Sequence, residues 1–181
     1  MVGGTAVALH IGHRRSIDFD LFTFGHLDKV RIKGKLIGFP FAKELIFEDT
    51  DQLHLLISNV KFTFLSYPYS VPHPITIDSI ITIPSLLSLA AMKAFALGRR
   101  AKWKDYVDLY FILHDYYTIR EISREAENIF NKQFSEKLFR QQLAFHKDID
   151  YTERIDYLVQ PVSDEEIKSF LVDTSTNIFA N

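Results

Sequence analysis

The strongest constraint on the fold is a change in the hydrophobic pattern of the chain at Pro84. Before this proline, short apolar runs alternate with turn signals, which is typical of β-strands. After it, apolar residues recur at helical spacing, and proline itself suits the first turn of a helix. Strands followed by helices predict the α+β class, with a small mixed or antiparallel sheet, an N-terminal helix and a C-terminal helical bundle.

The length of 181 residues predicts a single domain over 1–181, with a sheet core over 1–83 and a helical part over 84–181. The elements predicted in the first part are a helix over 5–12, a strand over 17–24, a helix over 28–37, an antiparallel meander of strands over 44–47, 53–58 and 60–67, and an extended return over 75–83. The helices predicted in the second part cover 84–99, 103–116, 119–132, 135–145 and 163–179. Ser163 and Glu166 are spaced as a capping box for the last of them.

The composition removes several classes of function. The chain has no cysteine, which excludes disulfides, cysteine-ligated zinc, iron–sulfur clusters and thiol nucleophiles, and which fits a reducing compartment. The longest apolar stretch, 86–97, is shorter than the ~20 residues needed to span a bilayer, and no secretory signal opens the chain, so we expect a soluble cytoplasmic protein. The net charge of −2 excludes a globally basic nucleic-acid coat and leaves a local basic patch open.

An acidic pair, Asp18 and Asp20, is the sharpest candidate for chemistry. On a strand, residues two apart point to one face, with Cα atoms ~7 Å apart. Adjacent carboxylates repel each other unless a cation lies between them, and Mg²⁺ prefers oxygen ligands that include substrate phosphates. The pair therefore predicts a Mg²⁺ (or Mn²⁺) site that bridges to a nucleotide. The alternative is an edge strand that carries two solvated carboxylates.

A glycine turn, Gly3-Gly4-Thr5, precedes the acidic strand. We expect Thr5 to cap the helix that begins here, and Gly12 to end it. The N-terminus of a helix offers free N–H groups to a phosphate, and glycine lets the backbone approach closely. The pattern thus predicts phosphate donors beside metal ligands, with an ordinary turn as the alternative.

A lysine and two carboxylates form the third group of candidates. Lys93 lies in a helix so apolar that its ammonium must snorkel, pair with a carboxylate or bind an anion. Asp105 and Asp108 are three residues apart, so they share a face of the next helix. The alternative is purely structural, with Lys104 paired to Asp108 and Asp105 placed near the helix N-terminus.

Four cations fall within six residues, and Trp103 stands among them. Such a run could steer a polyanion such as RNA and stack one base, or it could be a solvated helix–helix connection. The four candidate RNA-binding residues are Arg99, Arg100, Lys102 and Lys104.

The glycine turn followed by 12–22 (GHRRSIDFDLF) resembles the first motif of the AbiEii/AbiGii toxin-type nucleotidyltransferases. These proteins are a branch of the DNA polymerase beta-like nucleotidyltransferase superfamily. Residues 92–94 (MKA) and 99–110 (RRAKWKDYVDLY) are similar to the second signature block of the same family. The two blocks occur in the family's order, and the resemblance covers roughly residues 1–115.

The resemblance implies an enzyme that moves a nucleoside monophosphate from an NTP to an acceptor hydroxyl, as the toxin of a toxin–antitoxin or abortive-infection system. It implies tRNA or a protein hydroxyl as acceptor and a cognate antitoxin as partner. Asp18 and Asp20 would be the metal ligands, and Lys93 would contact the triphosphate. Asp105 or Asp108 would be needed for activity, and spacing alone does not choose between them. The residues that would bind nucleotide phosphates are Gly3, Gly4, Thr5, Arg14, Ser16 and Lys93.

Two departures from the family pattern favour a rival hypothesis, a degraded module that binds nucleotide or RNA without turnover. Thr63 stands on the strand where much of the superfamily carries a third carboxylate, and Asp78 is a candidate substitute. Relatives also carry a helix and a strand before the glycine turn, whereas only Met1-Val2 precede it here, which suggests a missed or truncated start.

Overall fold

The computed structural model describes residues 1–177 and has a mixed four-stranded sheet of order β1-β4-β3-β2. β1 (Phe19–Phe24) runs parallel to β4 (Val60–Tyr67). β2 (Lys43–Glu48), β3 (Gln52–Ile57) and β4 form the antiparallel meander that the sequence predicts. The α+β class and the mixed sheet are therefore confirmed.

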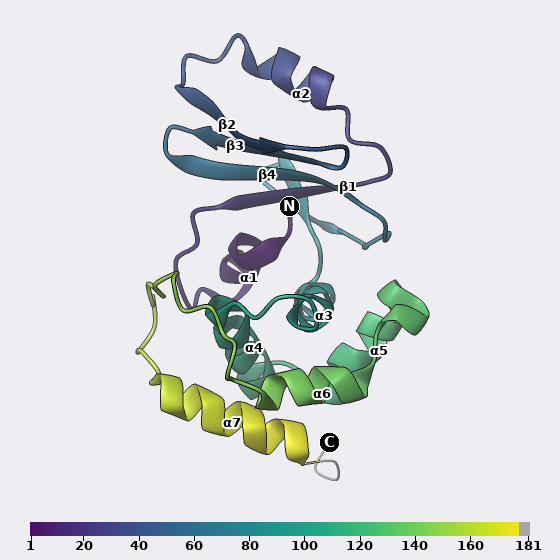
Figure 1. Ribbon diagram of the computed structural model, residues 1–181, viewed down its shortest axis with the longest axis vertical. Helices are drawn as coiled ribbons and strands as arrows, with labels where there is room; N and C mark the ends of the chain where they lie inside the picture. Colours follow the sequence, from purple (N-terminus) through teal and green to yellow (C-terminus); the bar gives the residue numbers. More distant parts are fainter. Residues whose placement is uncertain (178–181) are drawn as a thin grey trace.

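The two faces of the sheet have different neighbours (Figure 1). α2 (Lys29–Leu36) covers one face, where Leu53 and Leu55 of β3 are buried. The other face is turned toward α1 (Gly3–Ile11) and α3 (Leu86–Leu97). Because side chains alternate along a strand, the residue between Leu53 and Leu55 and its cross-strand partners face α3.

The N-terminus of α1 is fastened to the start of β1. The helix begins at Gly3 with Val2 as its N-cap, so the prediction that Thr5 caps it is wrong. Thr5 lies inside the first turn, and its hydroxyl donates to the carbonyl oxygen of Asp18. The Val2 N–H donates to the Asp20 carbonyl oxygen at 2.8 Å. These contacts hold the glycine turn against the acidic strand.

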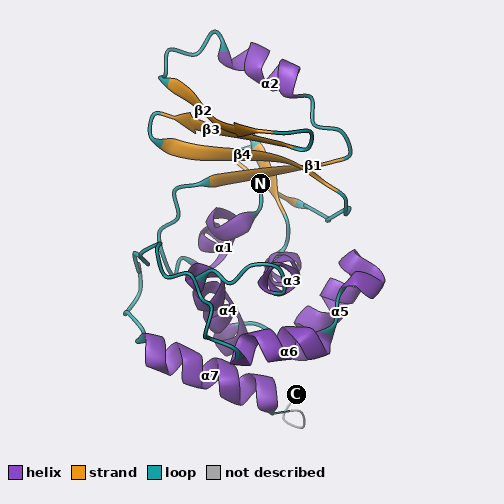
Figure 2. Cartoon of the chain, in the orientation of Figure 1, coloured by secondary structure: helices purple, strands orange, loops and turns teal. Residues whose placement is uncertain are grey.

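The second half of the chain is helical, as predicted (Figure 2). Its helices are α3, α4 (Trp103–Asp115), α5 (Ile119–Phe130), α6 (Glu136–Ala144) and α7 (Asp164–Thr176), with a short 3₁₀ turn at Asn131–Gln133. Ser163 caps α7 by accepting the N–H of Glu166. The predicted end of this helix at Phe179 falls outside the described residues. The main core joins Ala6 and Val7 of α1 to buried residues of α3, α4 and the later helices.

A small hairpin precedes the helical half of the chain. β5 (Ile75–Ile77) and β6 (Ile81–Ile83) pair as antiparallel strands where the sequence predicts an extended return.

None of the helices within residues 1–177 combines the length and apolar character that crossing a bilayer would require.

The connection from α6 to α7 packs against the loops that carry the two sequence motifs. We call residues 149–158 of this connection the strap. Asp150 exchanges backbone hydrogen bonds with Ala101 and Trp103, at 2.7 and 3.0 Å. Further along, Asp156 accepts the Arg15 N–H at 2.7 Å, and Leu158 donates to the His13 carbonyl oxygen at 3.0 Å. The strap therefore ties the loop after α1 to the loop before α4.

Candidate active site

A groove of about 380 Å³ lies between the sheet and α3. The sheet side includes Asp20 of β1, Thr63 of β4 and His54 of β3, and the helix side includes Lys93 and Arg99. A smaller polar pocket of about 90 Å³ adjoins it. The two cavities share Asp20, Lys61, Thr63, Lys93 and Arg100. The candidates from both sequence blocks thus meet at one place, although they are separated by more than 70 positions.

The acidic pair lies at the junction of the two cavities. Asp18 directly precedes β1 and lines the polar pocket, and Asp20 lines both cavities. Within residues 1–177, neither carboxylate forms an ion pair. Two half-buried carboxylates without a protein cation are suited to bind an external one.

Asp18 and Asp20 fit a cation whose remaining ligands come from a nucleotide and water. Residues 1–177 contain no cluster of three or more His, Cys, Asp or Glu side chains arranged for a metal. Mg²⁺ in phosphate-transfer sites commonly takes one or two carboxylates together with substrate phosphates and water. Asp18 and Asp20 match this donor set in number and in chemical type.

The two glycines of the turn are required by close packing. Gly3 has φ +75°, and a Cβ atom there would lie closer than 3.0 Å to Oδ2 of Asp20. A Cβ on Gly4 would lie 2.5 Å from Nη2 of Arg14. Gly3 lines the groove and Gly4 lines the polar pocket. The absence of a side chain at Gly3 lets the helix N-terminus approach Asp20, and its absence at Gly4 leaves room for the Arg14 guanidinium.

Gly3→Ala is expected to displace the Asp20 carboxylate and to reduce any activity that depends on it by about tenfold or more, with a stability loss of about 1–2 kcal/mol. Gly12→Ala is the matched control, because Gly12 also has a positive φ of +64° but has nothing within 4 Å of the position that a methyl group would take. Both variants should lose similar stability in urea denaturation. Equal activity in the two would contradict the role of the Gly3–Asp20 approach.

Lys93 is buried and its ammonium is paired. Nζ lies 2.6 Å from Oδ1 of Asp105 and 2.6 Å from Oδ2 of Asp108. Burial opposes the charged form, but the two carboxylates outweigh it and hold the pKa of Lys93 above its usual value. The ammonium is therefore charged at neutral pH, and it lines both cavities as a fixed cation.

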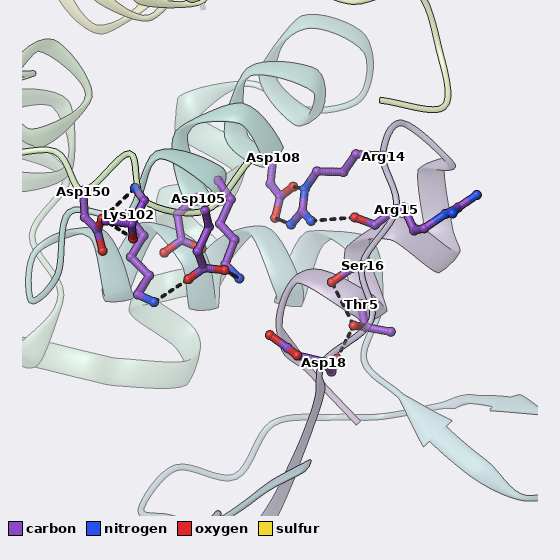
Figure 3. Close-up of polar contacts among 12 residues, drawn as sticks. Thr5, Arg14, Arg15, Ser16, Asp18, Lys102, Asp105, Asp108 and Asp150 are labelled. Carbon is purple, nitrogen blue, oxygen red and sulfur yellow. Dashed lines mark hydrogen bonds and ion pairs between the residues drawn. The ribbon is translucent and has the colours of Figure 1, made fainter. Parts of the chain in front are cut away.

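Asp108 is fully buried at the centre of a cluster of cations. Arg14 donates from Nε to its Oδ1 at 2.6 Å and from Nη2 to its Oδ2 at 2.9 Å (Figure 3). His13 Nε2 lies 2.7 Å from Oδ1. Burial alone would raise the pKa of Asp108, but Lys93, Arg14 and the His13 hydrogen bond hold it far below its usual range. Because the Arg14 side chain is only 4% exposed, its guanidinium is not presented to the groove.

Of Asp105 and Asp108, only Asp105 lines the polar pocket. It contacts Lys93 and also Arg100, whose Nε lies 3.2 Å from its Oδ2. Burial opposes ionisation, yet Lys93 and Arg100 hold the pKa of Asp105 below its usual value. The Lys104–Asp108 pair considered from the sequence does not form, because Asp108 points into the core and Lys104 pairs with Glu153.

Ser16 and Thr5 take part in one polar contact beside the pocket. The Thr5 hydroxyl donates to the Asp18 carbonyl oxygen, and its Oγ1 lies 2.9 Å from Ser16 Oγ, whose hydroxyl can donate to it (Figure 3). Ser16 lines the polar pocket, whereas Thr5 is buried and lines neither cavity. Thr5 therefore holds the loop in place and does not offer its hydroxyl to a phosphate in this structure.

The basic run lies along the rim of the two cavities. Arg99 and Arg100 line the groove, and Lys102 and Lys104 line the polar pocket with Arg100. Trp103 is only 4% exposed and packs on Tyr106 and Tyr151, so the expectation that it stacks on a base is wrong.

Glu153 is a residue of the pocket that the sequence did not indicate. It lies on the strap and accepts from Lys102 at 2.6 Å and from Lys104. Burial opposes its ionisation, but these two hydrogen bonds lower the pKa of Glu153 to about 2. It stands in a stretch without a recognisable motif and 51 positions from Lys102, so no local pattern could have found it.

Thr63 is the register partner of Asp20 on the neighbouring parallel strand. The position named from the sequence for a third carboxylate is therefore directly beside the acidic pair, and a hydroxyl occupies it. Asp78 lies in the turn between β5 and β6 and lines neither cavity, so it is not a substitute carboxylate for this site.

The structure shares its fold with solved structures of other proteins. It superposes on MenT4, a nucleotidyltransferase toxin from Mycobacterium tuberculosis H37Rv, with a TM-score of 0.61 at 17% identity, covering 96% of this chain and 73% of that one. It also matches JHP933 from Helicobacter pylori with a TM-score of 0.53 at 15% identity, covering 96% and 80% of the two chains.

The sequence assigns the family. The family described as nucleotidyl transferase AbiEii toxin, type IV TA system, matches residues 1–176, so the chain belongs to it. An uncharacterized protein of Aquifex aeolicus (strain VF5), aq_aa25, is 31% identical over 129 residues. That match covers 68% of this chain and 62% of the relative, so it extends over less than two thirds of the relative's length.

Proposed function

We propose that this protein is a metal-dependent nucleotidyltransferase that moves a nucleoside monophosphate from an NTP to an acceptor hydroxyl and acts as the toxin of a type IV toxin–antitoxin system. The observation that carries the proposal is the convergence of Asp18, Asp20, the glycine turn and Lys93 on two adjoining cavities. Family membership supports the same reaction class. A cognate antitoxin is the partner that the family description implies.

Different groups of the site would bind different parts of the metal–triphosphate complex. The N–H groups at the start of α1 would bind phosphate oxygens, because this helix end carries free donors and a favourable dipole. Lys93 and Arg100 would add positive charge from the opposite side of the groove. Asp18 and Asp20 would hold Mg²⁺ or Mn²⁺, which when bound neutralises the charge of the phosphates. Asp105 would hold the Lys93 ammonium in position through their 2.6 Å contact.

Asp108 has a different proposed role from Asp105. It would orient Lys93 and Arg14 from the buried side of the site, because it contacts both cations and is itself shielded from solvent. Arg14 would thus support the nucleotide site by packing under Gly4 and not by direct contact with phosphate.

We propose RNA, with tRNA as the first choice, as the acceptor. The basic rim of Arg99, Arg100, Lys102 and Lys104 borders the cavities, and clustered cations attract a nucleic-acid backbone. A protein hydroxyl is the second candidate for the acceptor.

The test uses each NTP labelled at the α-phosphate, incubated with the protein, Mg²⁺ and total tRNA. We expect label to enter tRNA from one or a few NTPs, to disappear with EDTA and to return with Mg²⁺ or Mn²⁺. A γ-labelled NTP should leave no label on the acceptor, because pyrophosphate departs. Failure of all four NTPs to label either tRNA or a protein would refute the proposed reaction.

A binding module without turnover is the rival function, and Thr63 in place of a third carboxylate is the observation that favours it. Both functions require NTP binding, and pyrophosphate release distinguishes them. Mg²⁺-dependent NTP binding in calorimetry without pyrophosphate release at long incubation would favour the rival. Pyrophosphate release with acceptor labelling would exclude it.

A further inference from the structure

A row of three polar side chains crosses the sheet on the face that forms the groove. Asp20 of β1 is the register partner of Thr63 of β4, and Thr63 is the register partner of His54 of β3. Register partners point to the same face of a sheet, and all three residues line the groove. His54 therefore occupies the next place in the row beyond the hydroxyl that stands where a third carboxylate is expected.

We propose that His54 accepts the proton of the attacking hydroxyl, directly or through one water, and so takes the role that a carboxylate at position 63 would have. This inference rests on the proposed nucleotidyl transfer. The short Thr63 side chain between Asp20 and His54 leaves room above it for the acceptor oxygen. The reacting oxygen would then lie between the metal-binding carboxylate and the imidazole.

The hydrogen bonding of His54 leaves a lone pair available. Its Nε2 lies 3.0 Å from Oε1 of Gln52, an atom that can only accept. Nε2 is therefore the protonated nitrogen in this assignment, and Nδ1 carries the lone pair that would take the proton. Gln52 also lines the groove, so it would hold the tautomer and orientation of the ring.

The charges around His54 favour the neutral, basic form. Partial burial and the nearby Lys61 of β4 lower the pKa of His54 below 6.5, and Asp20 and Asp49 oppose this effect. The side of the groove formed by α3 and the residues after it contributes three further cations, Lys93, Arg99 and Arg100. A neutral imidazole at pH 7 is the form that a general base requires.

The step balances as an in-line displacement at the α-phosphorus. The acceptor O–H bond breaks and its proton moves to Nδ1 of His54. The oxygen forms a bond to the α-phosphorus while the bond from that phosphorus to the bridging oxygen of pyrophosphate breaks. Pyrophosphate leaves with the electron pair, and His54 later returns the proton to solvent.

The experiment measures kcat and KM for acceptor labelling between pH 5 and 9 in the wild type, His54→Gln and the control His26→Gln, an exposed histidine away from both cavities. The wild type and the control should gain activity with rising pH through a pKa below 6.5. His54→Gln should lose this limb and about 10²–10³-fold in kcat, with little change in KM. Thermal melting checks that all variants fold.

A rescue variant separates proton transfer from a structural role. Thr63→Asp combined with His54→Gln places a carboxylate beside Asp20 and is expected to recover about tenfold or more of the lost kcat, with the acidic limb moved to lower pH. Recovery without that movement of the limb would overturn the proposal. So would a His54→Gln protein that keeps its kcat and its pH limb, or one that changes only in KM. Absence of transfer in the wild type itself would instead refute the proposed function, and the role of His54 with it.

Discussion

Replacing Asp20 with asparagine is expected to reduce nucleotidyl transfer by about 10³-fold while the protein stays folded. The change removes one negative charge where Mg²⁺ and the triphosphate would meet. Charge stabilisation by a bound metal lowers the activation barrier by several kcal/mol, and each ~1.4 kcal/mol of that barrier changes the rate tenfold. The Asp20 carboxylate has no ion-pair partner within residues 1–177, so its neutralisation leaves no buried cation unpaired. The size of the side chain is almost unchanged.

The measurement is single-turnover labelling of the acceptor at saturating NTP, with Mg²⁺ varied. Asp51→Asn is the matched control, because Asp51 is an exposed aspartate in the β2–β3 turn and lines neither cavity. The control should retain wild-type rates, and both variants should melt within a few degrees of the wild type. An Asp20→Asn protein with more than a tenth of the wild-type rate would refute the assignment of Asp20 as a metal ligand.

Replacing Asp108 with asparagine is expected to have the largest effect on stability, a loss of about 3–5 kcal/mol. Arg14 and Lys93 are both buried and both pair with this carboxylate, and removing one partner of a buried ion pair leaves charge uncompensated in the interior. Asp115→Asn is the control on the same helix, because the Asp115–His114 pair is about half exposed. A surface pair of this kind contributes about 0–1 kcal/mol.

The stability that Asp108 contributes is expected to fall with decreasing pH. The pKa of Asp108 is held below 3.8 in the folded protein, so at acidic pH the unfolded state binds a proton that the folded state does not. The stabilisation is fully present above pH ~4 and is progressively lost as the pH falls below it. Urea denaturation at pH 7 and at pH 3 should therefore show a smaller difference between Asp108→Asn and the wild type at the lower pH. A difference that stays constant would contradict the ion-pair explanation.

The order of the elements and the strand that carries the acidic pair could be predicted from local sequence pattern. The change of pattern at Pro84 predicts strands before helices, and the order of elements confirms it. The alternation around Asp20 indicates which strand faces the site. The boundaries are less exact at α1, where Thr5 is the expected cap although Val2 holds that position. The reason is that the hydroxyl of Thr5 finds a tertiary partner, the carbonyl oxygen of Asp18, which local propensity does not include.

The choice between Asp105 and Asp108 could not be made from their spacing. Both share a face of α4 and both contact Lys93, so the helix alone treats them alike. What separates them is Arg14, which lies 94 positions before Asp108 and takes up its carboxylate on the buried side. Asp105 remains at the pocket.

The fold class and the residue types that gather at the site could be read from the amino-acid order, because they follow from hydrophobic periodicity and from two ordered motifs. Which side chains face the cavities depends instead on how the elements pack. The pairing of Asp20 with Thr63, the place of His54 beside them and the contact of Glu153 with the basic run all rest on strand register and on the path of the strap. Such contacts join residues that are far apart in the chain, and their geometry is set by the packing of whole elements and not by local preference.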